Sequence, residues 1–207
     1  MHFGKPILLV FITFYAGSAV KAQYKEPEKK DKIETFYPKV PFDSLQAKQM
    51  LAKGKATIKG VAFTKPKSKW GFKVGQRIYA NQIKITLFPV TPYLESWYAL
   101  RKEKENLKKS RYVYLSNDAY RYRLEAITNS DGEFTFPNMK PGKYFLQGFL
   151  GYTHYGTYNE YTGSGYNSYG GQTDYYQQKT YSVDHEDRIE EFVEIKQDGE
   201  IVRLKLN

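Results

Sequence analysis

The chain has 207 residues, no cysteine and a formal net charge of +10 at pH 7. The absence of cysteine excludes disulfides and a lipid-modified N-terminal cysteine, so folding depends on a hydrophobic core, which a chain of this length can bury. The basic balance favours anionic partners such as acidic glycans or lipid headgroups.

The N-terminal residues have the pattern of a secretory signal peptide. Lys5 precedes an apolar run over residues 6–16, and Val20-Lys21-Ala22 is a small-residue cleavage site. A retained membrane anchor is the alternative, but the run is shorter than the ~20 residues of a spanning helix. We therefore expect residues 1–22 to be removed, leaving no transmembrane segment. The mature protein would be periplasmic or extracellular in a bacterium, where nucleic acid is not an expected partner.

Residues 23–55 are predicted to be a leader followed by a short helix. Lysine alternates with acidic residues over residues 25–32, which is typical of a solvated segment, with peripheral contact at an anionic surface as the alternative. Asp43 can cap a helix that continues to Leu51. Leu45 and Leu51 would then cover one end of the fold.

Two strands are predicted next, over residues 56–63 and 83–88, because their side chains alternate with a period of two. The connection between them, residues 64–82, contains Trp70 among several lysines. These residues form either a basic-aromatic patch for an anionic sugar or lipid, or a sheet edge that lysines protect from pairing. The lysines are Lys65, Lys67, Lys69 and Lys73.

Residues 91–110 read as an insertion that begins with an amphipathic helix. Thr91 is a helix-capping residue, and Pro92 suits the first helical position. Helical spacing places Leu94, Trp97 and Tyr98 on one face. We expect Trp97 and Tyr98 to cover an edge or mouth of the sheet, with docking of a partner as the alternative.

Alternating residues predict further strands in the C-terminal half. Residues 120–127 and 133–136 are expected to pair as a hairpin around the turn 129–132. Tyr144 and Leu146 restart the alternation, and the turn 197–199 precedes a last strand that ends near residue 206.

Two motifs in this region resemble the carboxypeptidase regulatory-like domain, a prealbumin-like module of secreted bacterial proteins. They are Asp131-Gly132-Glu133-Phe134-Thr135-Phe136 and Pro141-Gly142-Lys143-Tyr144-Phe145-Leu146. The resemblance implies an all-β fold, a seven-stranded Ig-like or prealbumin-like β-sandwich over residues 56–207 with insertions at 91–110 and 151–181. Such modules are scaffolds, linkers or adhesion units, and the peptidase half is absent.

The insertion at residues 151–181 is rich in tyrosine, glycine and small polar residues and has almost no aliphatic residue. It is therefore expected to be a long loop or an extended hairpin outside the core. Tyrosine loses few rotamers on binding, which favours a contact surface; a loop whose tyrosines pack on one another is the alternative. The candidate partner-binding residues are Tyr152, Tyr155, Tyr158, Tyr161, Tyr166, Tyr169, Tyr175 and Tyr176, together with Trp97 and Tyr98.

Catalytic and cofactor sites are not expected. His154 and His185 follow the signal peptide, and neither has a second His or Cys at metal-ligand spacing. Asp184, Glu186 and Asp187 flank His185 and suit either a hard cation or, more simply, a charged loop. The resulting hypothesis is an exported, non-catalytic module that binds an envelope protein or a glycan. A carbohydrate-binding module is the alternative, and a hydrolase with dispersed carboxylates is a remote one.

Overall fold

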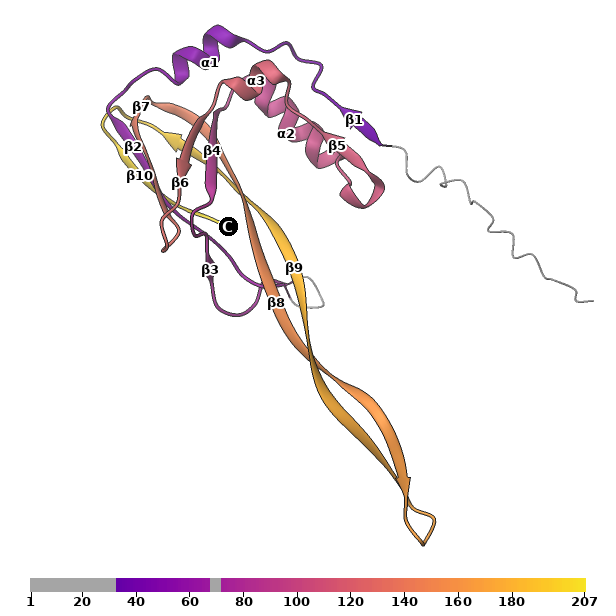
Figure 1. The fold of residues 1–207 in the computed structure, drawn as a ribbon. Coiled ribbons are helices and arrows are strands. Elements are labelled where there is room, and N and C mark those ends of the chain that lie inside the picture. Colours follow the sequence, from indigo (N-terminus) through magenta and orange to yellow (C-terminus); the bar gives the residue numbers. More distant parts are fainter. Residues whose placement is uncertain (1–32, 68–71) are drawn as a thin grey trace, which may run out of the picture. The chain divides into compact units, whose positions relative to one another are not determined.

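The computed structural model describes residues 33–67 and 72–207 (Figure 1). The predicted signal peptide, most of the predicted leader, and Lys69 and Trp70 of the proposed basic-aromatic patch lie outside these residues. The all-β class is confirmed, because the described chain forms two four-stranded sheets together with a two-stranded one. The expected count of seven strands is not confirmed.

The two large sheets have different pairing. In the first, β10 runs parallel to one edge of β2, whereas β7 and β3 pair antiparallel with the other edge. All neighbours in the second sheet are antiparallel. The first sheet contains β2 (Ala56–Thr64), β3 (Ile78–Tyr79), β7 (Glu133–Met139) and β10 (Ile201–Leu206), and the second has the order β6 (Leu124–Ile127), β4 (Lys84–Pro89), β8 (Gly142–Tyr166) and β9 (Gln172–Ile195).

A hydrophobic core joins these two sheets. Alternate residues of each strand contribute to it, as a period of two requires. Ile58 of β2, Ile85 of β4, Leu146 of β8 and Ile189 of β9 are fully buried in the same cluster. The alternation predicted at Leu146 is confirmed, whereas Ile189 lies in a part of β9 for which no strand was expected.

The predicted hairpin of residues 120–127 with 133–136 is wrong. β6 pairs with β4, and β7 pairs with β2 in the other sheet. The turn at 129–132 is present, but it carries the chain from one sheet to the other. Tyr120 lies in helix α3 (Asn117–Arg121), because the Ser116 hydroxyl accepts a hydrogen bond from the Ala119 N–H at 3.2 Å and caps that helix.

Helix α1 (Ser44–Met50) forms as predicted, because the Asp43 carboxylate accepts hydrogen bonds from the N–H groups of Leu45 and Gln46. Leu45, however, is 71% exposed, so its expected covering role is wrong. Ala47 is buried, and Leu51 packs against the core. The helix presents a different face from the one that the leucines indicated.

The Tyr144 hydroxyl fixes the end of α1 to β8. It lies 2.8 Å from the Lys140 carbonyl oxygen and 3.0 Å from the Met50 carbonyl oxygen, to which it donates. Burial raises the pKa of Tyr144 to about 12. The phenol therefore remains a neutral donor at physiological pH.

Helix α2 (Pro92–Lys104) packs on the outer face of the second sheet. Thr91 caps it, and Pro92 opens it as predicted. Leu94 and Trp97 pack against Phe88 and Phe145, together with Val113 of β5 (Arg111–Val113). A short 3₁₀ helix at Leu107–Lys109 joins α2 to β5, which pairs parallel with β1 (Glu34–Phe36). Among the described residues, no helix is both long and apolar enough to span a bilayer.

Candidate functional site: a tyrosine-rich ribbon

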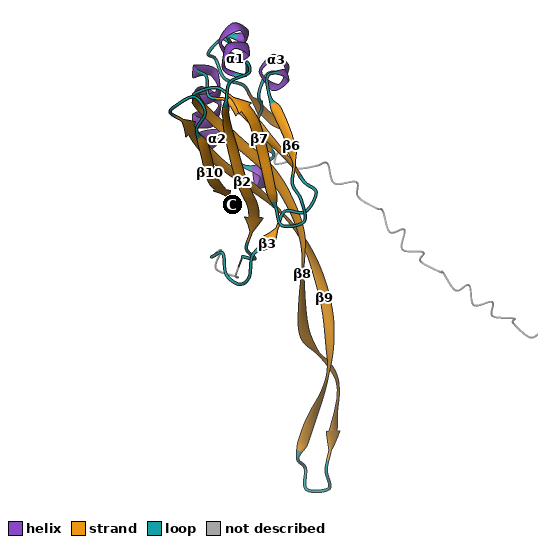
Figure 2. Cartoon of the chain, turned by 90° about the vertical axis from the view of Figure 1, so that its left-hand side faces the viewer, coloured by secondary structure: helices purple, strands orange, loops and turns teal. Residues whose placement is uncertain are grey.

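The predicted Tyr-rich insertion is an extended hairpin. β8 and β9 pair from Gly142 opposite Ile195 to Tyr166 opposite Gln172, whereas β4 accompanies β8 only over residues 144–148. From the pair Leu150–Asp187 toward their connecting turn, β8 and β9 continue past the ends of the other strands (Figures 1 and 2). We call residues 151–186 the tyrosine ribbon. At about 3.3 Å per residue, each of its strands extends for about 50 Å.

The register places tyrosines on both faces of the ribbon. Seven of the eight candidate tyrosines of the insertion are exposed, from 47% at Tyr158 to 96% at Tyr169, and Tyr152 is half-buried. Neither face of the ribbon contributes to a hydrophobic core cluster of the described residues. One face carries Tyr152, Tyr158, Tyr175 and Tyr181, and the other carries Tyr155, Tyr161, Tyr166 and Tyr176.

Cross-strand contacts order the ribbon in place of a core. The rings of Tyr161 and Tyr176 meet edge to face with their centroids 5.8 Å apart. The Tyr181 ring covers Gly156, where a Cβ atom would lie 2.4 Å from that ring, and Tyr175 lies more loosely over Gly165, where a Cβ atom would lie 3.0 Å from its hydroxyl oxygen. Glycine thus lets each ring lie close over the opposite strand, and each pair stabilises the ribbon locally.

Polar side chains organise the end of the ribbon. The Asn167 side-chain oxygen Oδ1 accepts hydrogen bonds from the N–H groups of Tyr169 and Gly171, at 3.0 and 2.7 Å, and fixes the turn. Ser164 and Gln172 both donate to Asp174. The hydrogen bond from Ser164, and then that from Gln172, hold the pKa of Asp174 below its usual value.

Asp187 ties the base of the ribbon to the opposite sheet. Its side chain is 6% exposed and accepts hydrogen bonds from the Thr64 hydroxyl at 2.5 Å and from Lys67 Nζ at 2.7 Å. Burial acts to raise the pKa of Asp187, but the hydrogen bonds from Lys67 and Thr64 and the charges of Lys67 and Lys73 outweigh it. The pKa therefore lies below its ordinary value.

The acidic segment around His185 is not the charged loop that we expected. Residues 184–187 belong to β9, and Thr153 donates to Asp184 at 2.7 Å while the His185 ring stacks on Tyr152. Across residues 33–67 and 72–207, no three His, Asp or Glu side chains gather in a metal-binding arrangement. Lys67 of the proposed basic patch forms an ion pair with Asp187.

The structure places Trp97 and Tyr98 in a packing role. Trp97 is 5% exposed and donates from its indole N–H to the Val113 carbonyl oxygen at 3.3 Å. Half-buried Tyr98 meets Phe145 and Phe192 edge to face. Both therefore cover the outer face of the second sheet, and little of the Trp97 side chain remains exposed for contact with a partner.

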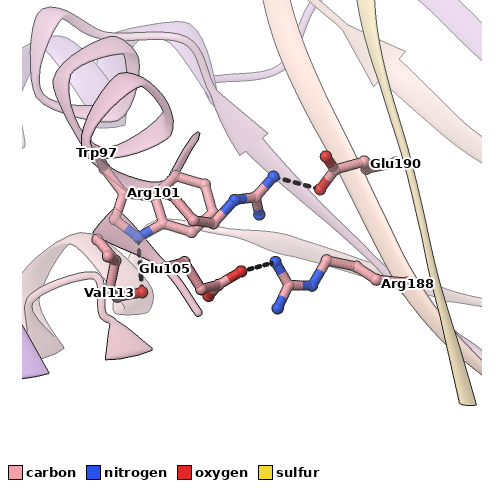
Figure 3. Close-up of polar contacts among 6 residues, drawn as sticks. All are labelled: Trp97, Arg101, Glu105, Val113, Arg188 and Glu190. Atoms are coloured by element: carbon pink, nitrogen blue, oxygen red, sulfur yellow. Dashed lines mark hydrogen bonds and ion pairs between the residues drawn. The ribbon is translucent and has the colours of Figure 1, made fainter. Parts of the chain in front are cut away.

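Arg101 completes this packed surface, and its helical spacing from Trp97 is its only signal in the sequence. Its guanidinium lies over the rings of Trp97 and Tyr98, 4.5 and 4.9 Å from their centroids, and donates to Glu190 of β9. Beside this pair, Arg188 donates to Glu105 at 2.6 Å (Figure 3). These ion pairs join α2 and its C-terminal end to β9. Their partners are 89 and 83 residues apart, so no local sequence pattern indicates them.

Comparison with known proteins supports the fold. No family model matches the sequence, and no curated protein matches it. The structure is similar to that of a protein from Pseudomonas aeruginosa provisionally described as carbohydrate binding, with a TM-score of 0.51 and 16% sequence identity. The similarity covers 80% of this chain and 98% of the other. At this identity the comparison shows a shared fold, that of a β-rich domain with two packed sheets.

Proposed function

We propose that this protein is an exported, non-catalytic binding module of the bacterial envelope, of the carboxypeptidase regulatory-like type. The sandwich is a rigid base, and the tyrosine ribbon contacts a partner protein. The observation that carries the proposal is the exposure of tyrosines on both faces of an ordered ribbon that adds nothing to the core. Tyrosine buries a large area on binding and loses little rotamer entropy.

The edges of the ribbon favour a protein as the partner. β9 is the last strand of its sheet, and β4 pairs with β8 only as far as Gly148, so both edges of the ribbon lack a neighbouring strand in the described chain. An edge with free backbone donors and acceptors is a template for a strand from another protein. Tyrosines on the faces would add specificity to such backbone pairing.

The positions of the carboxylates support a non-catalytic role. Arg101 binds Glu190, Arg188 binds Glu105, and Thr64 and Lys67 bind Asp187. These three carboxylates, which are buried or half-buried, thus hold elements of the fold together. A glycoside hydrolase that uses carboxylates would instead require one that converges with a second on a substrate, and a substrate panel that shows turnover would refute our proposal.

Glycan binding by the ribbon is the second candidate function. The similar protein from Pseudomonas aeruginosa is provisionally described as carbohydrate binding, and exposed tyrosine rings can stack on sugars. A glycan array with the wild type and a variant whose ribbon tyrosines are changed to serine separates the two. Glycan binding that the variant loses would favour this candidate.

Shortening the ribbon tests the main proposal. An Asn-Gly turn placed between Tyr152 and His185 removes residues 153–184 and leaves the base clamp in place. We expect the thermal transition to stay nearly unchanged, because the removed residues contribute nothing to either core cluster. Capture of the partner from envelope extracts should be lost.

A matched variant makes this test specific. Changing Tyr155, Tyr161 and Tyr176 to phenylalanine retains the aromatic area and should retain capture, whereas changing them to serine should abolish it. Capture of the same protein by the shortened variant would refute the assignment of the ribbon as the contact surface.

A further inference from the structure

A second candidate site lies on the outer face of the second sheet. A groove of about 660 Å³ opens between the sheet and the segment that runs from α2 to α3. This volume is in the range of small-molecule sites, roughly 300–1,000 Å³. Thr86, Gln147 and Phe149 of β4 and β8 form its floor, and Tyr112, Tyr114 and Tyr120 contribute to its walls.

The aromatic residues of the groove are available to a ligand. Tyr114, Tyr120 and Phe149 are 46%, 48% and 49% exposed, although they lie in a concave region. The rings of Tyr112 and Tyr114 are nearly parallel, at 12°, with their centroids 5.9 Å apart. The groove therefore offers flat apolar surfaces to a ligand that has an apolar face.

The polar residues of the groove carry both donors and acceptors, and each of its three cations already contacts a carboxylate. Arg101, Arg188 and Lys84 line it, and each is paired with a carboxylate: Arg101 with Glu190, Arg188 with Glu105, and Lys84 with Glu125. Hydrogen bonds from Lys84 and then Arg123 hold the pKa of Glu125 below its usual value, so this carboxylate stays ionised. Gln147 and Asn117 add amide groups. A ligand here need not carry charge.

Arg101 provides the observation that points to a ligand. The side chain is 5% exposed, and its buried Nη1 makes no hydrogen bond to any described residue. A buried donor without an acceptor is destabilising, so native proteins rarely leave one unless it has a role. In Figure 3 the terminal nitrogen that is not bonded to Glu190 lies on the side of the Glu105–Arg188 pair, and all three of Arg101, Glu105 and Arg188 line the groove.

We infer that this groove binds an uncharged saccharide. A sugar ring has an apolar C–H face, which the exposed rings can cover, and a rim of hydroxyls that both donate and accept. Planar Arg, Glu, Gln and Asn groups match adjacent hydroxyls in pairs. A ligand oxygen beside Arg101 would give Nη1 its acceptor once the side chains that cover this nitrogen move aside. This inference does not depend on the role of the ribbon.

Calorimetric titration of the mature chain tests the inference. The probes are maltose, cellobiose and N,N′-diacetylchitobiose, with galacturonic acid and inorganic phosphate as charged comparisons. We expect at least one neutral saccharide to bind. Gln147→Ala and Phe149→Ala should each weaken that binding about tenfold, the loss of one hydrogen bond or one stacking surface. Arg101→Lys, which keeps the charge but loses the planar fork, should weaken it at least as much.

Controls separate loss of the site from loss of the fold. Lys143→Ala changes an exposed residue of β8 that does not line the groove, and it should leave affinity unchanged. The thermal transitions of Gln147→Ala and Phe149→Ala should match the wild type. The shortened-ribbon variant should still bind the saccharide, so failure of the ribbon proposal and failure of this one give different results.

Three results would overturn the inference. The first is no binding of any neutral saccharide by the folded wild type. The second is binding that Gln147→Ala, Phe149→Ala and Arg101→Lys leave intact, or that removal of the ribbon abolishes, because the site would then lie elsewhere. The third is binding of galacturonic acid or phosphate without any neutral sugar, which would indicate an anion site.

Discussion

Asp187 shows how a single side chain sets the origin of the ribbon. It belongs to β9, whereas Thr64 ends β2 in the opposite sheet, and the hydrogen bond between them joins the two layers where the ribbon leaves the sandwich. The sequence showed Asp187 only as part of an acidic run. Its partner is 123 residues away, so no local pattern could have identified the contact.

The lowered pKa of Asp187 predicts a loss of stability in acid. The pKa in the folded state is below the ordinary value of 3.8, so ionised Asp187 stabilises the fold fully above about pH 4. That contribution is lost as the pH falls from there through the folded-state pKa. The free energies of unfolding of the wild type and Asp187→Asn, measured in urea, should therefore differ near neutral pH and become equal in acid.

Asp184→Asn is the matched control for this experiment, because Asp184 is exposed and its hydrogen bond to Thr153 lies within the ribbon. Its free energy of unfolding should follow that of the wild type at each pH. A difference between the wild type and Asp187→Asn that stays constant down to pH 2 would contradict the assigned clamp.

At the scale of elements, the sequence predicted what is local and missed what is not. Asp43, Thr91 and Pro92 identified the starts of α1 and α2, because capping acts within one turn of a helix. The period of two identified the core strands. Whether β6 pairs with β7 or with β4 depends on contacts between distant segments, and a turn at 129–132 suits either arrangement.

The cap of α2 gives a prediction at this scale. Thr91 is 2% exposed, and its hydroxyl accepts a hydrogen bond from the Leu94 N–H at 3.4 Å. Thr91→Val keeps the shape of the side chain but removes the acceptor, and it should lower the free energy of unfolding by about 1 kcal/mol. Urea denaturation measures this value. Thr91→Ser retains the capping hydroxyl and should lose less stability. An equal loss in both variants would show that side-chain packing contributes more than the cap.

For the whole molecule, composition and alternation predicted the all-β class, and the tyrosine-rich composition predicted a segment outside the core. The parallel pairing of β10 with β2 was not foreseen, because the turn at 197–199 suggests a simple return of the chain. The sequence also allowed either a loop or a hairpin at 151–181. The structure resolves that alternative through glycines placed beneath tyrosine rings, such as Gly156 beneath Tyr181.

Hydrogen exchange should separate the ribbon from the sandwich. Amides of β4 and the adjoining part of β8 lie in a sheet with a buried face, so their exchange should require global unfolding. Ribbon amides beyond Asp187 lie in a two-stranded segment with solvent on both faces, and such segments are marginally stable. We therefore expect the ribbon to exchange through local opening, at rates that low concentrations of urea barely change, while the sandwich remains protected.

The same measurement connects stability to function. A ribbon that opens locally loses conformational entropy when a partner strand pairs with its edge, and its exchange should then slow selectively. Exchange of ribbon and sandwich amides at one common free energy would show instead that the ribbon is an integral part of the cooperative fold. In that case the shortened variant should unfold, and the division into a rigid base and a separate contact arm would be wrong.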